Sequence, residues 1–596
     1  MPVSSPSSSS RTFVAIGTGA LLVLVVIVIT GGFVIEAGSF RLSSRRVTTP
    51  LLIALVAWTA AALHGRSRLS DALASLTRFL ERHATAAAIV LAAAAAGTGV
   101  AYGTYAASGA DAAGYVSQAT LIASGRISIG EPLTTQVGWP DAAWTFSPFG
   151  YRPGVAPNEL VPTYASGLPL VMAAATRIGG PLAAYLVVPL FGALAVLGCH
   201  ALAAALHSRT AGLVAAALMA TSPIFLFQLV QPMSDVPVAA LWALALLFAT
   251  LRIPGAPLAA GAAAGFAVLV RPNLLPLAAV IAVAAAGWPF AAPAGRRAAV
   301  ARLAAFVAGL LPAIGAQALL QWRLYGNPIA SGYGALSEIY VLSNVWPNVR
   351  GYGLRLVSGE PAAIVLALAS LGVMLLTRSL GPRTPAVKPL ALRAAGASAV
   401  VLICYLAYGV FAEWSYLRFL LPALPPTFAL VGALVAGALL KAPAPLRGLA
   451  LLLLVVAVGA TNVRVAAREQ AFNLQQFESR YRTAGRYLES ALPPEAVIVS
   501  VQESASARHY ARRPILRWDL LAADLDATVA ALTALGRRPV FLVEDWEAAD
   551  LRRRFPASPL ARLDWTPRAD FGTSTRARLF DPADRSGPSP VTDRVP

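Results

Sequence analysis

Residues 181–230 of this chain read PLAAYLVVPLFGALAVLGCHALAAALHSRTAGLVAAALMATSPIFLFQLV. The stretch holds two long apolar runs, 181–206 and 211–230, which are separated by a short polar gap around Arg209. A helix needs roughly 20 apolar residues to cross the hydrocarbon core of a bilayer, which is about 30 Å thick. Each run satisfies that length, so the stretch predicts two consecutive membrane spans.

Apolar runs of this kind recur through most of the chain. Hydrophobic residues make up 57% of the 596 residues and charged residues only 13%, whereas a soluble globular domain has about 25% charged residues. The pattern therefore predicts a mainly α, polytopic transmembrane helical bundle of about thirteen spans. The predicted spans are 13–35, 51–64, 85–107, 181–206, 211–230, 236–251, 257–270, 272–290, 303–320, 361–377, 394–411, 417–440 and 446–463.

The distribution of basic residues predicts the side of the membrane on which each loop lies. Cytoplasmic loops are enriched in Arg and Lys, and a cytoplasmic N-terminus places most of the Arg-bearing gaps inside. The loops 108–163 and 321–360 then lie outside, and both are poor in basic residues for their length. Only the loop 36–50 departs from this pattern. An odd number of spans places the C-terminus outside, and the basic gaps explain the formal charge of +19 without a nucleic-acid partner.

The polar C-terminal part of the chain predicts a small extracytoplasmic α/β domain. Short β-type runs at 496–501 and 539–543 accompany helical patterns at 524–535 and 546–555. The last residues are rich in Ser, Pro and Gly, which is typical of a disordered end. The predicted parts are an N-terminal helical hairpin with a cytoplasmic linker (1–84), a main transmembrane domain with the outside loop 108–163 (85–463), the extracytoplasmic domain (464–583) and a disordered tail (584–596).

The outside loop 108–163 contains the sequence GADAAGYVSQA at residues 109–119, directly after the third predicted span. Asp111 lies at the mouth of that span, and Tyr115 and Gln118 follow at helical spacing on one face. These side chains present an acid and hydrogen-bonding groups at the membrane interface, where a lipid headgroup would lie. The alternative interpretation is that Asp111 only caps the helix that begins after it.

A second acid, Asp235, lies in a very short outside turn with the sequence QPMSDVP. An ionisable group so close to hydrocarbon is costly, and it marks a candidate functional site. The alternative is again a helix cap, with Pro237 in the first turn of the helix that follows.

Three arginines are predicted on the same outer face as the two acids. Arg271 ends an apolar run, Arg323 opens the loop 321–360, and Arg418 follows Glu413 by five residues. The planar, permanently charged guanidinium suits a phosphate, although each arginine could simply extend to the interface with no other role. Acids and arginines together predict a site for a lipid phosphate and a polar acceptor. We include Glu413 among the predicted substrate-binding residues of that site.

The order of these motifs resembles that of the C-type (GT-C) membrane glycosyltransferases, the group of protein mannosyltransferases and lipid A aminoarabinose transferases. An acid ahead of Tyr-x-x-Gln-Ala comes first, and Ser-Asp-Val-Pro follows a Thr-Ser-Pro at 221–223. Val-Arg-Pro-Asn and Leu-Arg-Phe-Leu-Leu-Pro come later. The resemblance covers roughly residues 85–463 and rests on the order of motifs that are individually weak.

The resemblance implies a sugar donor on a polyprenyl phosphate and inverting transfer, outside the cytoplasm, to a glycan, lipid or protein acceptor. The enzyme would be a multi-pass protein of the bacterial cell membrane. Asp111 would be the general base for the acceptor hydroxyl, and Asp235 would be a second acid that positions acceptor or donor. Arg271 and Arg418 would offset charge on the departing lipid phosphate. A lone Asp111 stands where many relatives carry paired acids, which leaves a divalent metal open.

Two other membrane functions compete with this interpretation. A transporter or lipid flippase places ionisable groups at mid-membrane and often shows repeats or broken helices, whereas these groups are predicted at the outer ends of spans. A polymerising, O-antigen-ligase-like enzyme would rely on Arg and His in a large outside loop, but the only His predicted outside is His509, in the C-terminal part. The expected function is a glycosyltransferase, with a transporter or flippase as the alternative.

Overall fold

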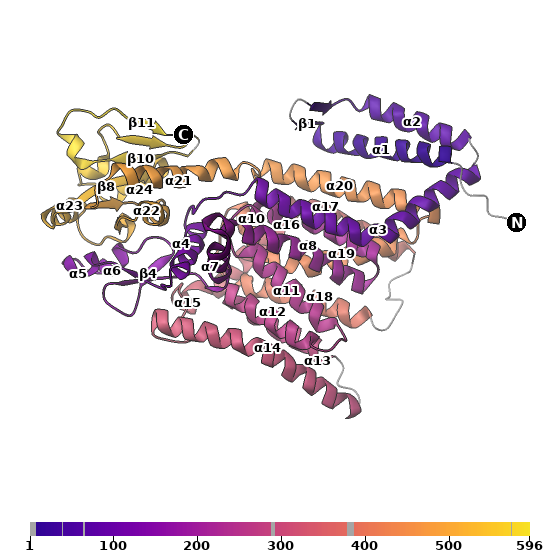
Figure 1. Cartoon of the computed structure of the whole chain (residues 1–596), viewed down its shortest axis with the longest axis horizontal. Helices are drawn as coiled ribbons and strands as arrows, with labels where there is room; N and C mark the ends of the chain where they lie inside the picture. Colours follow the sequence, from indigo (N-terminus) through magenta and orange to yellow (C-terminus); the bar gives the residue numbers. More distant parts are fainter. Residues whose placement is uncertain are drawn as a thin grey trace.

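The chain folds into an elongated molecule with a helical bundle at its centre (Figure 1). The helices α1 (Ser8–Thr30) and α2 (Thr48–Leu63) lie at one end, and the C-terminal sheet lies at the other. The computed structural model describes residues 8–37, 40–63, 66–287, 293–377, 387–573 and 575–595.

Seven helices in the described ranges are long and apolar enough to cross a membrane, and the count rises to nine if two bent helix pairs each form one span. All of the predicted apolar runs coincide with helices, but several of these helices are shorter than a full span. Proline contributes to the shortening, because Pro272 follows the end of α12 and cannot continue its hydrogen bonding. The long helices are α1, α3 (Arg66–Ala101), α8 (Val187–Leu206, extended by a 3-10 turn), α14 (Pro293–Tyr325), α18 (Val387–Leu406), α19 (Leu424–Leu439, preceded by η4, Trp414–Ala423) and α20 (Arg447–Arg468). The short ones include α2, α11 (Asp235–Thr250), α12 (Ala256–Val270) and α13 (Leu277–Ala286).

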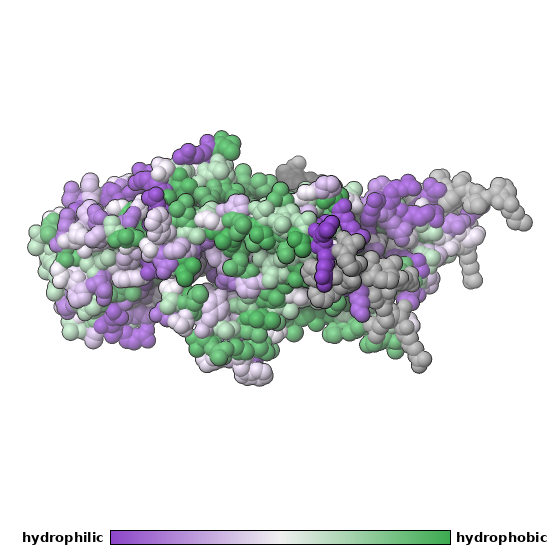
Figure 2. Space-filling model, turned by 90° about the horizontal axis from the view of Figure 1, so that it is seen from below, coloured by the Kyte–Doolittle hydropathy of each residue, from purple (hydrophilic) through white to green (hydrophobic). Residues whose placement is uncertain are grey.

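The surface of the bundle is apolar between two hydrophilic ends. Figure 2 shows hydrophobic residues over the middle of the molecule and hydrophilic residues over the C-terminal end at the left. Large apolar side chains point outward from the helices, and Val56 and Leu368 are 67% and 65% exposed. Apolar surface on this scale needs lipid rather than water around it, so the architecture is that of a polytopic membrane protein.

Two of the helices in the bundle are broken, and the two breaks meet. The helices α9 (Arg209–Thr221) and α10 (Pro223–Leu229) are bent by 57°, and the segment Leu336–Gly359 and α17 (Pro361–Leu376) are bent by 89°. Ser222 occupies the first break and donates a hydrogen bond of 2.5 Å to Glu360 in the second. Both residues are buried, so a polar contact inside the bundle joins the two bends.

The loop after α3 forms a compact layer at the end of the bundle that lies near the C-terminal sheet (Figure 1). It contains α4 (Asp111–Ala123), which packs against α7 (Gly167–Gly179). The residues that connect these two helices in the chain form a three-stranded antiparallel sheet of order β3-β5-β4. The remaining elements of the layer are β3 (Ile129–Gly130), α5 (Leu133–Gln136), α6 (Ala142–Thr145), β4 (Tyr151–Pro153) and β5 (Glu159–Pro162).

The C-terminal part forms a six-stranded mixed sheet of order β11-β9-β10-β8-β6-β7. The pairs β6–β7 and β6–β8 are parallel, whereas β10 is antiparallel to both β8 and β9. The helix α21 (Leu474–Ala491) joins this sheet to α20. The other elements are β6 (Ala496–Val499), α22 (Ser504–Ala511), β7 (Ile515–Leu516), α23 (Leu525–Ala534), β8 (Arg538–Glu544), α24 (Asp545–Arg554), β9 (Ala569–Phe571), β10 (Ala577–Phe580) and β11 (Asp593–Val595).

The structure adds detail to three of the predicted parts of the chain. The helix α3 continues through the expected boundary at residue 84, because the charged stretch before it is also helical. The basic loop 36–50 contains a hairpin of β1 (Phe33–Ala37) and β2 (Phe40–Ser44). Within the predicted tail 584–596, β11 pairs in parallel with β9.

Candidate active site

Asp111 is the first residue of α4, and its carboxylate turns away from the helix end. No side chain caps this helix. Instead, Arg418 Nη2 lies 2.6 Å from Asp111 Oδ2, and the Tyr164 hydroxyl donates to Oδ1 at 2.7 Å. Arg418 comes from η4 and Tyr164 follows β5, so three distant segments of the chain meet at this acid.

The surroundings of Asp111 keep it ionised while leaving it reachable. Burial disfavours the charged carboxylate, but the charge of Arg418 and the hydrogen bonds from Tyr164 and Arg418 outweigh that effect. The pKa of Asp111 is therefore lowered below its usual value of 3.8. Its side chain remains 31% exposed, so an acceptor group can approach it.

Asp235 forms a second ion pair that is sealed from solvent. It begins α11, and its Oδ1 lies 2.7 Å from Arg271 Nη2, at the end of α12. Its side chain is only 1% exposed. Arg271 also donates to Ser234 Oγ at 3.1 Å, and the Tyr115 hydroxyl donates to the same oxygen at 2.9 Å. Asp235 therefore holds Arg271 through Oδ1, and its Oδ2 is buried without a hydrogen-bond partner among the described residues.

The two ion pairs converge on one aromatic ring. The guanidinium carbons of Arg418 and Arg271 lie 5.3 Å and 5.8 Å from the centroid of the Phe419 ring. Arg271 is also close enough to Asp111 to contribute to the lowering of its pKa. Both acids and both arginines therefore belong to one site.

A cavity of about 360 Å³ opens beside these pairs. Its volume falls in the range of small-molecule sites, roughly 300–1,000 Å³. Arg271 and Phe419 line it directly, and Tyr164 connects it to Asp111. Seven of the 16 tyrosines of the chain line the cavity, namely Tyr115, Tyr164, Tyr325, Tyr333, Tyr340, Tyr405 and Tyr408.

The structure brings together most of the residues predicted for the site, but not all of them. Tyr115 lines the cavity. Gln118 is buried behind it, and its Nε2 donates to Ser166 Oγ at 2.9 Å. Arg323 and Glu413 are exposed and do not line the cavity. The guanidinium of Arg323 instead lies over the Trp322 ring. The predicted substrate-binding role of Arg323 and Glu413 therefore has no support from this cavity.

Several residues of the site escaped the sequence interpretation. Tyr164, Tyr405 and Phe419 contact the two ion pairs. No motif marks the two tyrosines, and the motif at 417–422 contains Phe419 without assigning it a role. The available signal was the placement of tyrosines in outside loops and at the outer ends of apolar runs. That signal does not show which of them face a common space.

The described residues contain no group of three or more His, Cys, Asp or Glu side chains arranged to hold a metal ion. Asp111 and Asp235 each face an arginine rather than another acid. The pairing leaves both carboxylates neutralised by side chains of the chain itself.

The C-terminal domain packs directly on the segment that leads into Asp111. The Tyr510 hydroxyl accepts a hydrogen bond of 2.8 Å from the Ala107 backbone N–H, and Glu478 is hydrogen-bonded to Ser108. Arg508 pairs with the buried Glu131 at 3.0 Å. The position of Asp111 therefore depends on the C-terminal domain as well as on the bundle.

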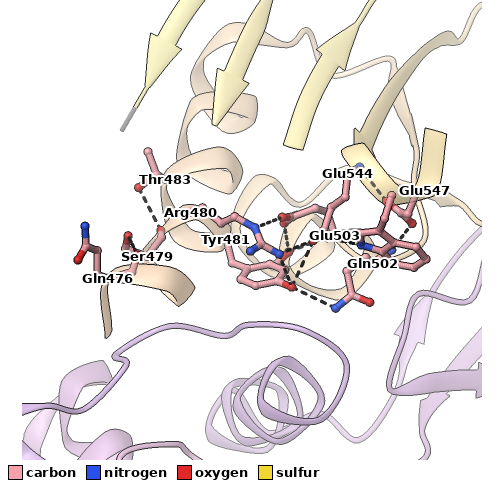
Figure 3. A network of polar contacts seen from close by, with 11 residues as sticks. Gln476, Ser479, Arg480, Tyr481, Thr483, Gln502, Glu503, Glu544 and Glu547 are labelled. Carbon is pink, nitrogen blue, oxygen red and sulfur yellow. Dashed lines mark hydrogen bonds and ion pairs between the residues drawn. The ribbon is translucent and has the colours of Figure 1, made fainter. Parts of the chain in front are cut away.

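Buried side chains stabilise this face of the C-terminal domain. Figure 3 shows Arg480 of α21 between Glu503 and Glu544, which follow β6 and end β8, with the loop layer directly below. Gln502 donates from its Nε2 to the Tyr481 hydroxyl at 3.1 Å. The network fixes the loops that lie against the Asp111 segment.

Comparison with solved structures identifies the architecture. The chain is similar to ArnT from Cupriavidus metallidurans bound to undecaprenyl phosphate, with 14% identity and a TM-score of 0.52, covering 84% of this chain and 99% of that one. The same values hold for ArnT in the apo state. The archaeal oligosaccharyltransferase AglB from Archaeoglobus fulgidus, in complex with an inhibitory peptide and a dolichol-phosphate, matches with 14% identity and a TM-score of 0.47, covering 83% of this chain and 74% of that one. No family model and no curated protein matches the sequence.

The likeness to ArnT spans nearly the whole of that protein, so the chain has the fold of a C-type membrane glycosyltransferase. The resemblance inferred from the order of motifs is confirmed at the level of the fold.

Proposed function

We propose that the chain is an integral membrane glycosyltransferase that moves a sugar from a polyprenyl phosphate to an acceptor outside the cytoplasm, with inversion at the anomeric carbon. The observation that carries the proposal is the convergence of Asp111–Arg418 and Asp235–Arg271 beside one cavity. The fold of ArnT, whose crystal structure holds undecaprenyl phosphate, supports the class of donor. The acceptor is a glycan, lipid or protein of the bacterial cell envelope.

Asp111 is the general base of the proposed reaction. It is ionised, it is partly exposed, and it lies next to the cavity through Tyr164. It accepts the proton of the acceptor hydroxyl while that oxygen attacks the anomeric carbon. Positioned proton transfer of this kind contributes about 10²–10⁴-fold to a rate.

Arg271 stabilises the leaving phosphate of the proposed donor. It is the charged residue that lines the cavity, and Asp235 and Ser234 fix its guanidinium from behind. As the bond to the sugar breaks, negative charge grows on the phosphate oxygen. A cation held in place before the reaction stabilises this charge without further reorganisation. Arg418 remains paired with Asp111 and holds its carboxylate in the orientation needed for proton transfer.

A transporter of lipid-linked substrates is the second candidate, and one observation favours it. Broken helices with ionisable groups at the break are typical of transporters, and Glu360 lies at such a break against Ser222. A transporter would move its substrate across the bilayer without forming a covalent product.

The variant Asp111→Asn tests the proposal. Purified protein in proteoliposomes is given a polyprenyl-phosphate sugar from a panel of common sugars, together with an envelope extract as acceptor, and release of free polyprenyl phosphate is measured. We expect wild-type protein to release it and Asp111→Asn to be slower by about 10²–10⁴-fold. Asp141→Asn is the matched control, because Asp141 is exposed in the same loop and makes no contact with the cavity.

Two results would contradict the proposal. Full activity of correctly inserted Asp111→Asn would remove the base assignment. Counter-flow of the lipid-linked sugar by wild-type protein, without any covalent product, would favour the transporter instead.

A further inference from the structure

The lining of the cavity carries information about the sugar. Given the proposed glycosyl transfer, on which this step rests, we infer that the donor carries a single uncharged sugar ring. A sugar with a free amine and a uronic acid are the two classes that the inference excludes.

The charges around the cavity leave no partner for a charged sugar. Among the described residues that line it, Arg271 is the one charged side chain. Its guanidinium is committed to Asp235 and, in the proposed reaction, to the donor phosphate. Asp111, which lies outside the lining, is already paired with Arg418 at 2.6 Å. Asp235 Oδ2 is buried without a hydrogen-bond partner in the described part of the chain, but Asp235 lies outside the lining and its other oxygen pairs with Arg271. An ammonium on the sugar would therefore meet no carboxylate in the described lining, and a carboxylate would meet no second cation there.

The neutral polar groups of the lining suit sugar hydroxyls instead. Gln317 and Gln321 lie four residues apart on α14, so they share one face of that helix. Asn273 adds a third amide to the lining. An amide side chain both donates and accepts hydrogen bonds, as a sugar hydroxyl requires. Gln317 Oε1 is buried and has no partner among the described residues, which leaves an acceptor in place for a ligand hydroxyl.

Aromatic rings supply the remaining surface. Tyr164 lies between Tyr115 and Tyr333, with ring centroids 4.8 Å and 5.7 Å away. These rings offer flat apolar faces with hydroxyl groups at their ends, which match the C–H faces and the hydroxyl edges of a pyranose or furanose. The cavity volume of about 360 Å³ is near the lower limit for small-molecule sites, so it fits one sugar ring rather than an oligosaccharide.

The inference separates this chain from the aminoarabinose transferases that its sequence motifs resemble, because aminoarabinose carries an amine. Proteins that share a fold can differ in the side chains that contact the sugar, and those side chains determine which charge the site accepts.

The experiment compares donors that differ only in charge. Binding to purified full-length protein is measured with polyprenyl-phosphate arabinose, glucose, mannose and galactose, with the 4-amino-4-deoxy counterpart of each, and with the uronic acid counterparts of the three hexoses. We expect the best neutral donor to bind about 30-fold or more tightly than both of its charged counterparts, because an unpaired buried charge is costly. Release of polyprenyl phosphate in proteoliposomes is measured for the same set.

A pair of variants tests the role of the lining itself. Gln317→Glu and Gln321→Glu place a carboxylate in the cavity and are expected to reverse the preference, with weaker binding of the neutral donor and tighter binding of its amino counterpart. Gln475→Glu adds the same charge at an exposed position of α21, away from the cavity, and is expected to leave the preference unchanged.

The possible outcomes separate this inference from the proposed function. Equal or better binding and turnover of a charged donor by wild-type protein overturns the inference and leaves glycosyl transfer intact. Failure of every donor to bind or react overturns both. An unchanged preference in both cavity variants, with the variants folded, overturns the assignment of the sugar to this lining.

Discussion

Asp111 and Asp235 carry the same carboxylate, and their surroundings give them different tasks. Asp111 is 31% exposed and Asp235 is 1% exposed, although each is paired with one arginine. In the proposed reaction the exposed, ionised Asp111 exchanges a proton with the acceptor, whereas the buried Asp235 holds Arg271 in place. The sequence predicted both acids and both arginines, because each is an ionisable residue at the end of an apolar run. It could not predict this difference, which depends on Tyr164 and Ser234 from other segments.

The pH dependence of transfer should reflect the lowered pKa of Asp111. A base whose pKa is lowered stays deprotonated until the pH falls to that lower value, so activity should not decline between pH 7 and pH 5 through this group. Loss is expected only below about 4, near the usual pKa of an aspartate. Measuring kcat/KM against pH checks this. Tyr164→Phe removes one hydrogen bond that lowers the pKa, so its acidic limb should move to higher pH. An acidic limb near pH 6 in the wild-type protein would contradict the assignment.

The pair of Asp235 and Arg271 should show strong coupling in stability. Asp235→Asn leaves the guanidinium of Arg271 buried without a counter-charge, which typically costs about 3–5 kcal/mol. Arg271→Gln leaves Asp235 unpaired in the same way. The double variant removes both charges. We expect its loss of unfolding free energy to be smaller than the sum of the two single losses by a coupling energy of about 1–3 kcal/mol. Thermal unfolding in detergent measures all three. Strictly additive losses would show that the pair is not an energetic unit.

At the scale of elements, the sequence predicted where helices occur better than where they end. Each apolar run contains a helix within the described residues, but the run 13–35 ends in β1, α3 continues into the charged stretch before it, and α13 is only 10 residues long. Hydropathy shows contact with lipid, whereas helix ends depend on Pro, Gly and local hydrogen bonds. The breaks at Ser222 and Glu360 illustrate this. Each precedes a proline in the chain, but their mutual hydrogen bond is visible only in the structure.

The C-terminal domain is an element whose contacts bear on the site, and its buried acids make it sensitive to pH. Burial raises the pKa of Glu503 to about 8, more than the charge of Arg480 lowers it. In the unfolded chain a glutamate titrates near 4.3. At a pH between these two pKa values, Glu503 is protonated in the folded state and deprotonated in the unfolded state. Stability therefore falls as the pH rises from about 4.3 to about 8.

The variant Glu503→Gln should remove this loss of stability. A glutamine stays neutral at every pH and retains a hydrogen-bonding group at the same place. We expect the Tm of the wild-type protein to fall between pH 5 and pH 8.5 and that of the variant to fall less. Glu495→Gln serves as the matched control, because Glu495 is exposed on the same domain, and it should follow the wild-type curve. A variant curve parallel to the wild type would show that Glu503 does not titrate in this range.

At the scale of the whole molecule, α4 and the C-terminal sheet lie at one end of the bundle, and the α1–α2 hairpin lies at the other (Figure 1). Asp111 begins α4, and the cavity and the second ion pair belong to the same site. The positive-inside pattern of Arg and Lys assigns the first end to the outside. This orientation is a prediction from the charge pattern of the sequence. The sequence could not predict that α21 and the sheet dock on the segment before Asp111, since no local pattern specifies contacts between the two ends of a chain.

Cysteine labelling tests this orientation directly. Ser70 at the start of α3 and Ala530 on α23 are both exposed, and the apolar bundle lies between them. With the native Cys199 and Cys404 replaced by Ala, the variants Ser70→Cys and Ala530→Cys are treated with a membrane-impermeant maleimide in intact spheroplasts. We expect Ala530→Cys to react from outside and Ser70→Cys to react only after lysis. The donor phosphate and the acceptor must then meet at the outer face, because Asp111 and Arg271 lie at the same end as α23. The reverse labelling pattern would place the site in the cytoplasm and exclude an acceptor outside it.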